Sequence, residues 1–512
     1  MKKIFLIFLS LAVSASLFAQ TAEEALGYAQ EFREGTARTM AMGNAFTALG
    51  GDLGAIGINP ASSGVFRYSQ VAVSPSLTVS RSLADYLGND SKASNTGFTL
   101  SNMGAVFSFD TGRYTGLLNF NFAVVYNKKN SFRSKMSAYG ATDGSSMLSS
   151  IATELEGITD TELERNNFGS DIPWPGQLAW NTYVLAPLSV LGGKYADVHD
   201  SYIASTENYI EATDELRIGG ALDQTFNRRT KGSDEEFSFN FGGNVSDFFY
   251  FGVNADFHTV TRTVEEYYEE AAQNPSLFQD GFVSMSNKFW LHTGGSGIGI
   301  KLGAIVTPVA GLRFGATVST PTWYRLTDQW DYTMNTAFNN SNKYTSYSPT
   351  GSYSYRVTTP MRWSLGAAYT FFDRGLISVD FENTNYANTR ILEESRNEGI
   401  FSEENQYIRQ NYLNSSVIKL GGEFWFGHFM ALRGGYQYHS PAVKGDKGYN
   451  VFSTGLGFRI GPAATIDLAW MHIASHIDSF QLYDDYSPAV SVPVGTNKHS
   501  MGKVVCTFAY KF

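Results

Sequence analysis

Charged residues stand singly at alternate positions of otherwise apolar segments, and these are the side chains whose type and spacing could support chemistry. They are Asp256, Lys301, Arg313, Arg362, Asp380, Glu382, Lys419, Glu423, Arg433, Arg459 and Asp467. Because both signs occur, we expect most of them to form ion pairs across an enclosed interior. A cation without such a partner would bind a carboxylate, which is costly to bury alone. Arg362, Lys419 and Arg433 lie furthest from the neighbouring turns and are the candidates for that role.

Catalytic and cofactor motifs are not recognisable in the chain. HExxH, CxxC, the P-loop and GxSxG do not occur. His472 and His476 are four residues apart, which places both on one face of a strand, but a metal site needs a third ligand and none is evident. We therefore predict that the protein is not an enzyme and has neither a metal nor a cofactor.

Charge, cysteine content and the N-terminus restrict the class of protein. The formal net charge of -10 gives no basic surface for nucleic acid. A single cysteine, Cys506, excludes an internal disulfide framework. Residues 1–19 combine Lys2 and Lys3 with a short apolar run and small residues ending at Ala19, which predicts a cleavable secretory signal and export from the cytoplasm.

The composition is typical of a membrane barrel. Aromatic residues make up 15% of the chain, Gly contributes 50 residues, and charged residues only 17%, yet the mean hydropathy is -0.19. After residue 19 no segment approaches the roughly 20 consecutive apolar residues that a membrane helix needs. In a barrel, apolar side chains face lipid and alternate with small or polar side chains that face the interior.

Period-2 alternation recurs along the chain from residue 71 onward. Phe237, Phe239 and Phe241 alternate with small and polar residues, and many similar segments are joined by short turns. The chain ends in such a segment, whose Phe508, Tyr510 and Phe512 share one face. A terminal Phe of this kind resembles the signal that the outer-membrane assembly machinery recognises.

We count fourteen such segments and predict an all-β fold, a 14-stranded antiparallel transmembrane β-barrel over residues 71–512. Both chain ends then lie on the side of the short turns. The expected long extracellular loops are residues 83–97, 128–234, 264–296, 321–351, 388–412, 440–449 and 477–498. The loop 128–234 exceeds the usual ceiling of about 15 residues and must have its own structure, including a short helix at 145–156.

Residues 20–70 lack sustained alternation and are rich in Gly and Ala, so we expect them to fold as a plug inside the barrel. Within residues 35–61 an Arg follows small residues, then comes an Asp in a turn, then Asn59-Pro60-Ala61 just before the first strand. This pattern resembles the N-terminal hatch of the FadL/TodX family. Pro60 fixes the backbone at this point and prevents a helix from continuing through it.

The resemblance implies a function and a set of site residues. Hatch and gating residues would be Arg38, Gly43, Asp52, Asn59, Pro60 and Ala61, and the wall of an apolar pocket would be Phe46, Leu49, Ile56 and Phe66. The expected activity is passive uptake of long-chain fatty acids, aromatic hydrocarbons or similar compounds by loop capture, a luminal pocket, hatch movement and lateral release. Gly104, Gly112 and Gly116 are candidates for a break in the wall, but the sequence does not locate the gate.

The expected location is the bacterial outer membrane, with its lipids, the assembly machinery and a hydrophobic small molecule as partners of a monomer. An alternative in the same architecture is a plugged adaptor that docks secreted proteins and has a static hatch. The aromatic-rich stretch 173–191 fits two readings, a groove for first capture or a set of contacts that hold the long loop together.

Overall fold

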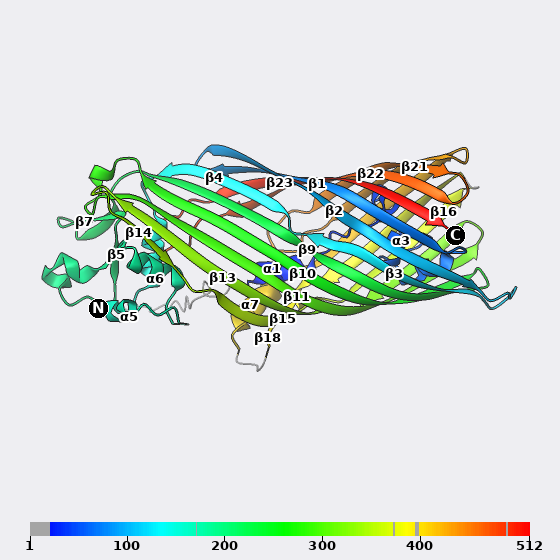
Figure 1. Cartoon of the computed structure of the whole chain (residues 1–512), viewed down its shortest axis with the longest axis horizontal. Helices are drawn as coiled ribbons and strands as arrows, with labels where there is room; N and C mark the ends of the chain where they lie inside the picture. The colour runs from blue at the N-terminus through cyan, green and yellow to red at the C-terminus, as the bar shows by residue number, and fades with distance from the viewer. Residues whose placement is uncertain (1–20, 170, 372–373, 395–398, 488–489) are drawn as a thin grey trace, which may run out of the picture.

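A closed antiparallel β-barrel of 14 strands forms the body of the molecule, as predicted (Figure 1). The computed structural model describes residues 21–512 except 170, 372–373, 395–398 and 488–489, so the expected signal sequence at 1–19 lies outside the described residues. The ring closes because β23 pairs with β1. In order around the ring the strands are β1 (Gln70–Tyr86), β2 (Asn89–Asp110), β3 (Leu117–Ser131), β9 (Leu222–Val245), β10 (Phe249–Ala272), β11 (Phe282–Val309), β12 (Leu312–Ser319), β16 (Arg362–Phe371), β17 (Gly375–Asn385), β19 (Asn414–Phe426), β20 (Met430–His439), β21 (Tyr449–Ile460), β22 (Ala464–Phe480) and β23 (Gly495–Lys511).

The predicted alternation determines which side chains face lipid. On β9, Phe239 is 52% exposed while its neighbours Ser238 and Asn240 are buried in the lumen. On β23, Phe508 and Tyr510 are likewise exposed on the outer face. The recognition of these last residues by the assembly machinery stays a prediction.

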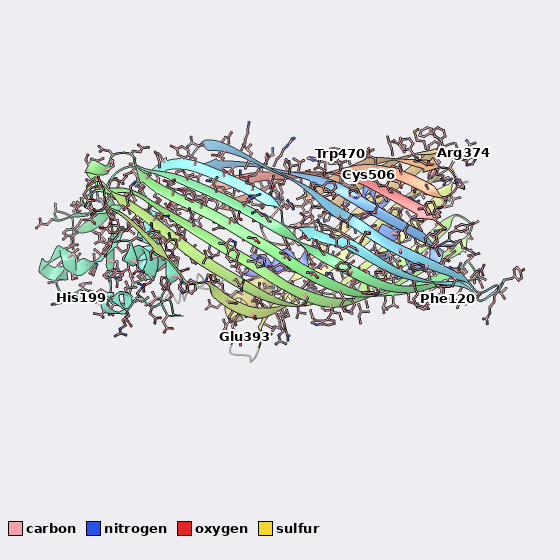
Figure 2. The ribbon with its side chains drawn as sticks, viewed as in Figure 1. Phe120, His199, Arg374, Glu393, Trp470 and Cys506 are labelled. Atoms are coloured by element: carbon pink, nitrogen blue, oxygen red, sulfur yellow. The ribbon has the colours of Figure 1, made fainter. Side chains whose placement is uncertain are left out.

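Short turns gather at one end of the barrel and long connections at the other. In Figure 1 the C-terminus lies at the end with the short turns, which we call the periplasmic end. Figure 2 places Phe120 and Arg374 near this end, whereas His199 lies at the opposite, extracellular end. This arrangement agrees with the predicted direction of the chain.

Most strands extend much further outward than predicted, so most of the expected loop boundaries are wrong; the loop expected at 440–449 agrees with the ends of β20 and β21 to within a residue. β9 and β10 have 24 residues each and β11 has 28, lengths of about 80 to 90 Å at about 3.3 Å per residue, against a lipid band of about 25 Å. Most of the expected loop 83–97 is strand, because β1 and β2 meet in a tight turn at residues 87–88. Outside the membrane no lipid covers the outer face of a strand, so polar residues stand there as well and the apolar alternation that predicted the strands is missing. The additional outer strands are β4 (Ser134–Thr142), β13 (Trp323–Phe338), β14 (Lys343–Tyr347), β15 (Gly351–Thr358) and β18 (Arg390–Glu393), and helix α7 (Ser402–Asn411) follows β18.

Residues 143–169 and 171–221 fold as an extracellular module whose hydrophobic core is shared with the outer parts of β1, β10, β11 and β13. Its elements are α4 (Met147–Glu154), α5 (Asp160–Glu164), α6 (Trp174–Asn181), β5 (Leu185–Pro187), β6 (Tyr202–Ala204), β7 (Glu207–Ile210) and β8 (Glu215–Ile218). The helix expected at 145–156 is confirmed as α4. Trp174 contacts Trp330 of β13 and Trp180 contacts Tyr202, which favours the reading that these aromatic side chains hold the module together.

Glu154 makes the stability of this module dependent on pH. Burial, with Asp484 nearby, raises the pKa of its carboxyl to about 7. The folded state therefore keeps a proton that the unfolded state loses near pH 4.5, and stability falls as pH rises from about 4.5 to 7. We expect Glu154→Gln to stabilise the module by about 2 kcal/mol at pH 8 and to leave it unchanged at pH 4. Limited proteolysis across this pH range measures the effect, and an equal gain at both pH values would contradict it.

Candidate functional site

The hatch lies inside the ring (Figure 1) and is built from short helices with polar caps. These are α1 (Ala22–Ala29), α2 (Ala37–Ala41), α3 (Leu53–Ile56) and the 3-10 helix η2 (Pro60–Val65). The side chains of Thr21, Thr36, Asp52 and Asn59 accept backbone N–H bonds at their respective N-termini, as Ser, Thr, Asp and Asn commonly do. No helix among the described residues is long and apolar enough to cross a membrane.

Asn59 joins the hatch to the barrel wall. Its side-chain Oδ1 accepts the Ala61 N–H at 3.0 Å, and its Nδ2 donates to the Thr47 carbonyl at 2.6 Å and to the Ala304 carbonyl of β11 at 3.2 Å. Pro60 occupies the first position of η2, where a missing N–H costs nothing. The Asn-Pro-Ala element therefore fixes where the hatch meets β11.

Glycines of the wall make room for the hatch backbone. A Cβ at Gly252 would lie within 3.0 Å of Pro60, and one at Gly303 within 3.0 Å of Asn59. At Gly435 it would lie within 3.0 Å of the Gly43 nitrogen. Any larger side chain at these inward positions would overlap with the plug, so the high glycine content of the wall follows in part from hatch packing.

Arg38 anchors the hatch electrostatically. Its guanidinium makes two hydrogen bonds, 2.8 and 2.9 Å, to the Glu423 carboxylate of β19. Arg433 donates to the same carboxylate at 2.7 Å and to Asp467 at 2.5 Å. Arg433, a candidate for ligand binding, is thus engaged in the anchor of the hatch and does not line either lumen cavity described below.

The remaining predicted hatch residues are buried against the wall. Gly43 has φ of 62° and donates its N–H to Ser453 at 3.1 Å, and Asp52 accepts the Thr36 hydroxyl at 2.6 Å. The four apolar candidates separate into two clusters: Phe46 and Leu49 pack near Ala368, whereas Ile56 and Phe66 pack near Val106. The structure does not bring them to one pocket wall in this conformation.

Two small cavities lie between the hatch and the wall at the level of Arg362. The larger has a volume of about 60 Å³ and is lined by both Arg362 and Lys419, two of the predicted carboxylate-binding residues. A neighbouring cavity of about 20 Å³ shares Arg362. Glu382 accepts hydrogen bonds from both cations, from Lys419 at 2.8 Å. Each cavity holds a few water molecules at most and neither is large enough for an acyl chain.

The ladder between β2 and β3 ends part of the way up the wall. It runs from the pair Asp110 and Asn119 to the pair Asn102 and Asn127; beyond it β2 pairs with β1 and β3 with β9. From residue 125 to residue 130, β3 is buried on both faces. The candidate Gly104 lies within the paired ladder, and Gly112 and Gly116 lie in the periplasmic turn.

Glu34 of the hatch lies behind this break, and the sequence reasoning did not identify it. Its backbone N–H donates to the Lys128 carbonyl of β3 at 2.8 Å. Its carboxylate accepts the Ser101 hydroxyl of β2 at 2.6 Å and pairs with Lys503 of β23. One hatch residue therefore connects three strands at the point where two of them stop pairing. The available signal was the charged group Glu31, Arg33 and Glu34 just before the Gly- and Ala-rich segment.

Among the described residues no group of three or more His, Cys, Asp or Glu side chains could hold a metal ion. His476 hydrogen-bonds to Asp478, and His472 stacks on Trp470. The two histidines are separated by a register shift between Ile473 and His476, so their sequence spacing does not translate into a shared site.

A closed 14-stranded barrel with an N-terminal hatch in its lumen defines the class of plugged outer-membrane β-barrel proteins. The sequence of residues 224–512 matches the model of the outer membrane protein transport protein family (OMPP1/FadL/TodX), and the chain belongs to that family. The matched region excludes the hatch, where the Asn59-Pro60-Ala61 element had indicated the same family.

Solved structures support the fold. A Pseudomonas aeruginosa FadL homologue is 12% identical with a TM-score of 0.55, covering 94% of this chain and 99% of that one. The Pseudomonas putida toluene transporter TodX is 13% identical with a TM-score of 0.53 and the same coverage of both chains. The Ralstonia pickettii toluene transporter TbuX is 15% identical with a TM-score of 0.50, again covering 94% and 99%. No curated protein sequence matches the chain.

Proposed function

We propose that this protein is a passive outer-membrane channel for hydrophobic small molecules, with long-chain fatty acids as the substrate class. The substrate enters among the extracellular loops, is held at the lumen cavity, and leaves sideways into the membrane after the hatch moves. The family supports the general role in outer-membrane transport, and toluene transporters among the similar structures are in keeping with a hydrophobic cargo. No catalytic step is required.

The observation that carries this proposal is the break between β2 and β3. Both strands continue beyond Asn102 and Asn127 without pairing with each other. An apolar molecule gains nothing by entering periplasmic water, so an opening toward lipid is a favourable exit. The hatch segment around Glu34 blocks this opening from within. Hatch displacement would therefore open the substrate cavity and the exit together.

An adaptor that docks secreted proteins is the second candidate, and the extracellular module favours it because this module adds a folded surface at the extracellular end (Figure 1). An adaptor needs no hatch movement and no break in the wall. Transport and docking therefore differ in whether uptake depends on the hatch.

Uptake of labelled oleate by cells or liposomes tests the proposal. We expect the wild-type protein to take up oleate and a variant with Asn59→Ala and Pro60→Ala to take it up roughly fivefold faster, since loss of the buried hydrogen bonds of Asn59 weakens the closed position of the hatch by about 1 kcal/mol or more. The matched control carries Asn340→Ala and Pro349→Ala at exposed positions. If neither form of a correctly folded barrel takes up oleate or another hydrophobic ligand, the adaptor reading replaces this one.

A further inference from the structure

An ion-pair network surrounds the lumen cavities and balances its charges. Contacts of 4.0 Å or less link its cations and carboxylates, which are equal in number when His258 is neutral. The cations are Arg33, Lys129, Lys301, Arg362 and Lys419, and the carboxylates are Glu31, Asp234, Glu236, Asp256 and Glu382. Removing one carboxylate would leave one positive charge uncompensated in a closed space.

Glu31 is the carboxylate of this network that lacks a short hydrogen bond. It lies 3.3 Å from Arg33, 3.8 Å from Lys129 and 3.9 Å from Arg362. Every other carboxylate of the network accepts a hydrogen bond of 2.8 Å or less, from Tyr324, Arg33, Ser238 or Lys419. The Glu31 side chain is also the most exposed of the five, at 19%. Glu31 therefore gives up no hydrogen bond as short as those of the other four when it moves.

The same residue borders the space that a ligand would enter. Glu31 lines both cavities, and Phe32 lines the larger one. Two buried polar atoms of the larger cavity, Oδ1 of Asn44 and Oγ1 of Thr317, have no hydrogen-bond partner among the described residues. A hydroxyl without a partner and three cations shared with one loosely held carboxylate form a site for an anionic group.

We propose that the Glu31 carboxylate is a built-in competitor for the headgroup of a single-chain carboxylic acid, and that displacing it releases the hatch from the β2–β3 break. This inference rests on the proposed function and names its headgroup site. The incoming carboxylate takes the place of Glu31 between Arg33, Lys129 and Arg362, so the network stays neutral. Glu31 is then free to leave its position between these three cations.

The chain connects this site to the wall over a short distance. Between the end of α1 at Ala29 and the start of α2 at Ala37 the hatch is neither helix nor strand. Glu31 and Glu34 are three residues apart, about 10 Å or less along an extended chain. Glu34 connects β2, β3 and β23 at the break. A movement of Glu31 is therefore transmitted over three residues of chain to Glu34, which lies at the β2–β3 break.

Binding of laurate and of uncharged dodecanol to the purified, detergent-solubilised full barrel tests this proposal, with Glu31→Gln as the variant. We expect Glu31→Gln to bind laurate at least roughly tenfold more tightly than the wild type, because an uncompensated positive charge remains in a closed space, and to bind dodecanol as the wild type does. Glu23→Gln, an exposed hatch position outside the network, is the matched control. Glu31→Asp, which keeps the charge, should gain far less laurate affinity than Glu31→Gln.

Each other result decides against the inference in a different way. If Glu31→Gln and the wild type bind laurate equally, Glu31 is no competitor, while the channel itself stands. If dodecanol gains affinity as much as laurate, the variant has enlarged the cavity and charge is not the cause. If no form binds laurate or dodecanol although the barrel is folded, the proposed function fails for this substrate class and the inference fails with it.

Discussion

Replacing Gly435 with valine is expected to force the hatch out of its closed position and open the barrel to small ions. Gly435 faces the lumen on β20, where a Cβ would lie within 3.0 Å of the Gly43 nitrogen and of the Met42 carbonyl carbon. Both are backbone atoms of the hatch, so no side-chain rotation relieves the overlap. Overpacking of this kind costs about 1 to 3 kcal/mol or more, and we expect the open fraction to rise roughly tenfold or more. Conductance in planar bilayers measures it.

Gly434 supplies the matched control on the same strand. It faces outward, and a Cβ there would meet no atom within 4 Å. Gly434→Val adds the same side chain one residue away and should leave the conductance at the wild-type level. If the two variants have equal conductance and both barrels are folded, the valine at position 435 displaces the barrel wall and the hatch keeps its closed position. The contrast therefore tests whether wall glycines hold the plug by its backbone.

The fold could be predicted because the membrane imposes a strict rule on the sequence. Lipid on one side of the wall requires an apolar residue at every second position, and Phe237, Phe239 and Phe241 meet this rule directly. The rule ends where the lipid ends. For this reason the outer parts of β9, β10 and β11 were expected as loops although they are paired strands.

The candidate site was predictable only in part. Alternation shows that Arg362, Lys419 and Arg433 face inward, but not the height or the partner of each side chain. Arg362 and Lys419 line a cavity, whereas Arg433 binds Glu423 and Asp467 together with the hatch anchor. Residues that are hundreds of positions apart become partners only when the ring closes, so no local sequence pattern predicts these contacts.

The acids of the hatch were missed for a related physical reason. Glu31 and Glu34 lie in an irregular segment, where no periodicity assigns a side chain to a face. Asn59-Pro60-Ala61 could be found because its backbone constraints are local. The contacts that hold the hatch are instead ion pairs to distant strands, from Arg38 to Glu423 and from Glu34 to Lys503. A local motif thus identified the hatch but did not identify the ion pairs that hold it in place.

Breaking the buried pair between Glu34 and Lys503 is expected to release the hatch from the β2–β3 break. Both residues are at most 3% exposed, and removing one partner of such a pair costs about 3 to 5 kcal/mol because the other charge stays buried alone. Glu34→Gln should therefore raise the displaced fraction roughly a hundredfold. Ala37→Cys, placed at a fully buried hatch position and combined with Cys506→Ser, reports displacement through its rate of labelling by a soluble maleimide.

A double-mutant cycle separates the ion pair from general damage to the hatch. Lys503→Gln alone should resemble Glu34→Gln, whereas the two changes together should label less than roughly tenfold faster than the reporter parent, since no bare charge remains. If the increase in labelling rate of the double variant equals the product of the increases of the two single variants, the two residues act independently. Glu34 also connects β2 to β3. If the cycle shows coupling and Glu34→Gln takes up oleate faster, the ion pair between Glu34 and Lys503 controls the exit through the wall.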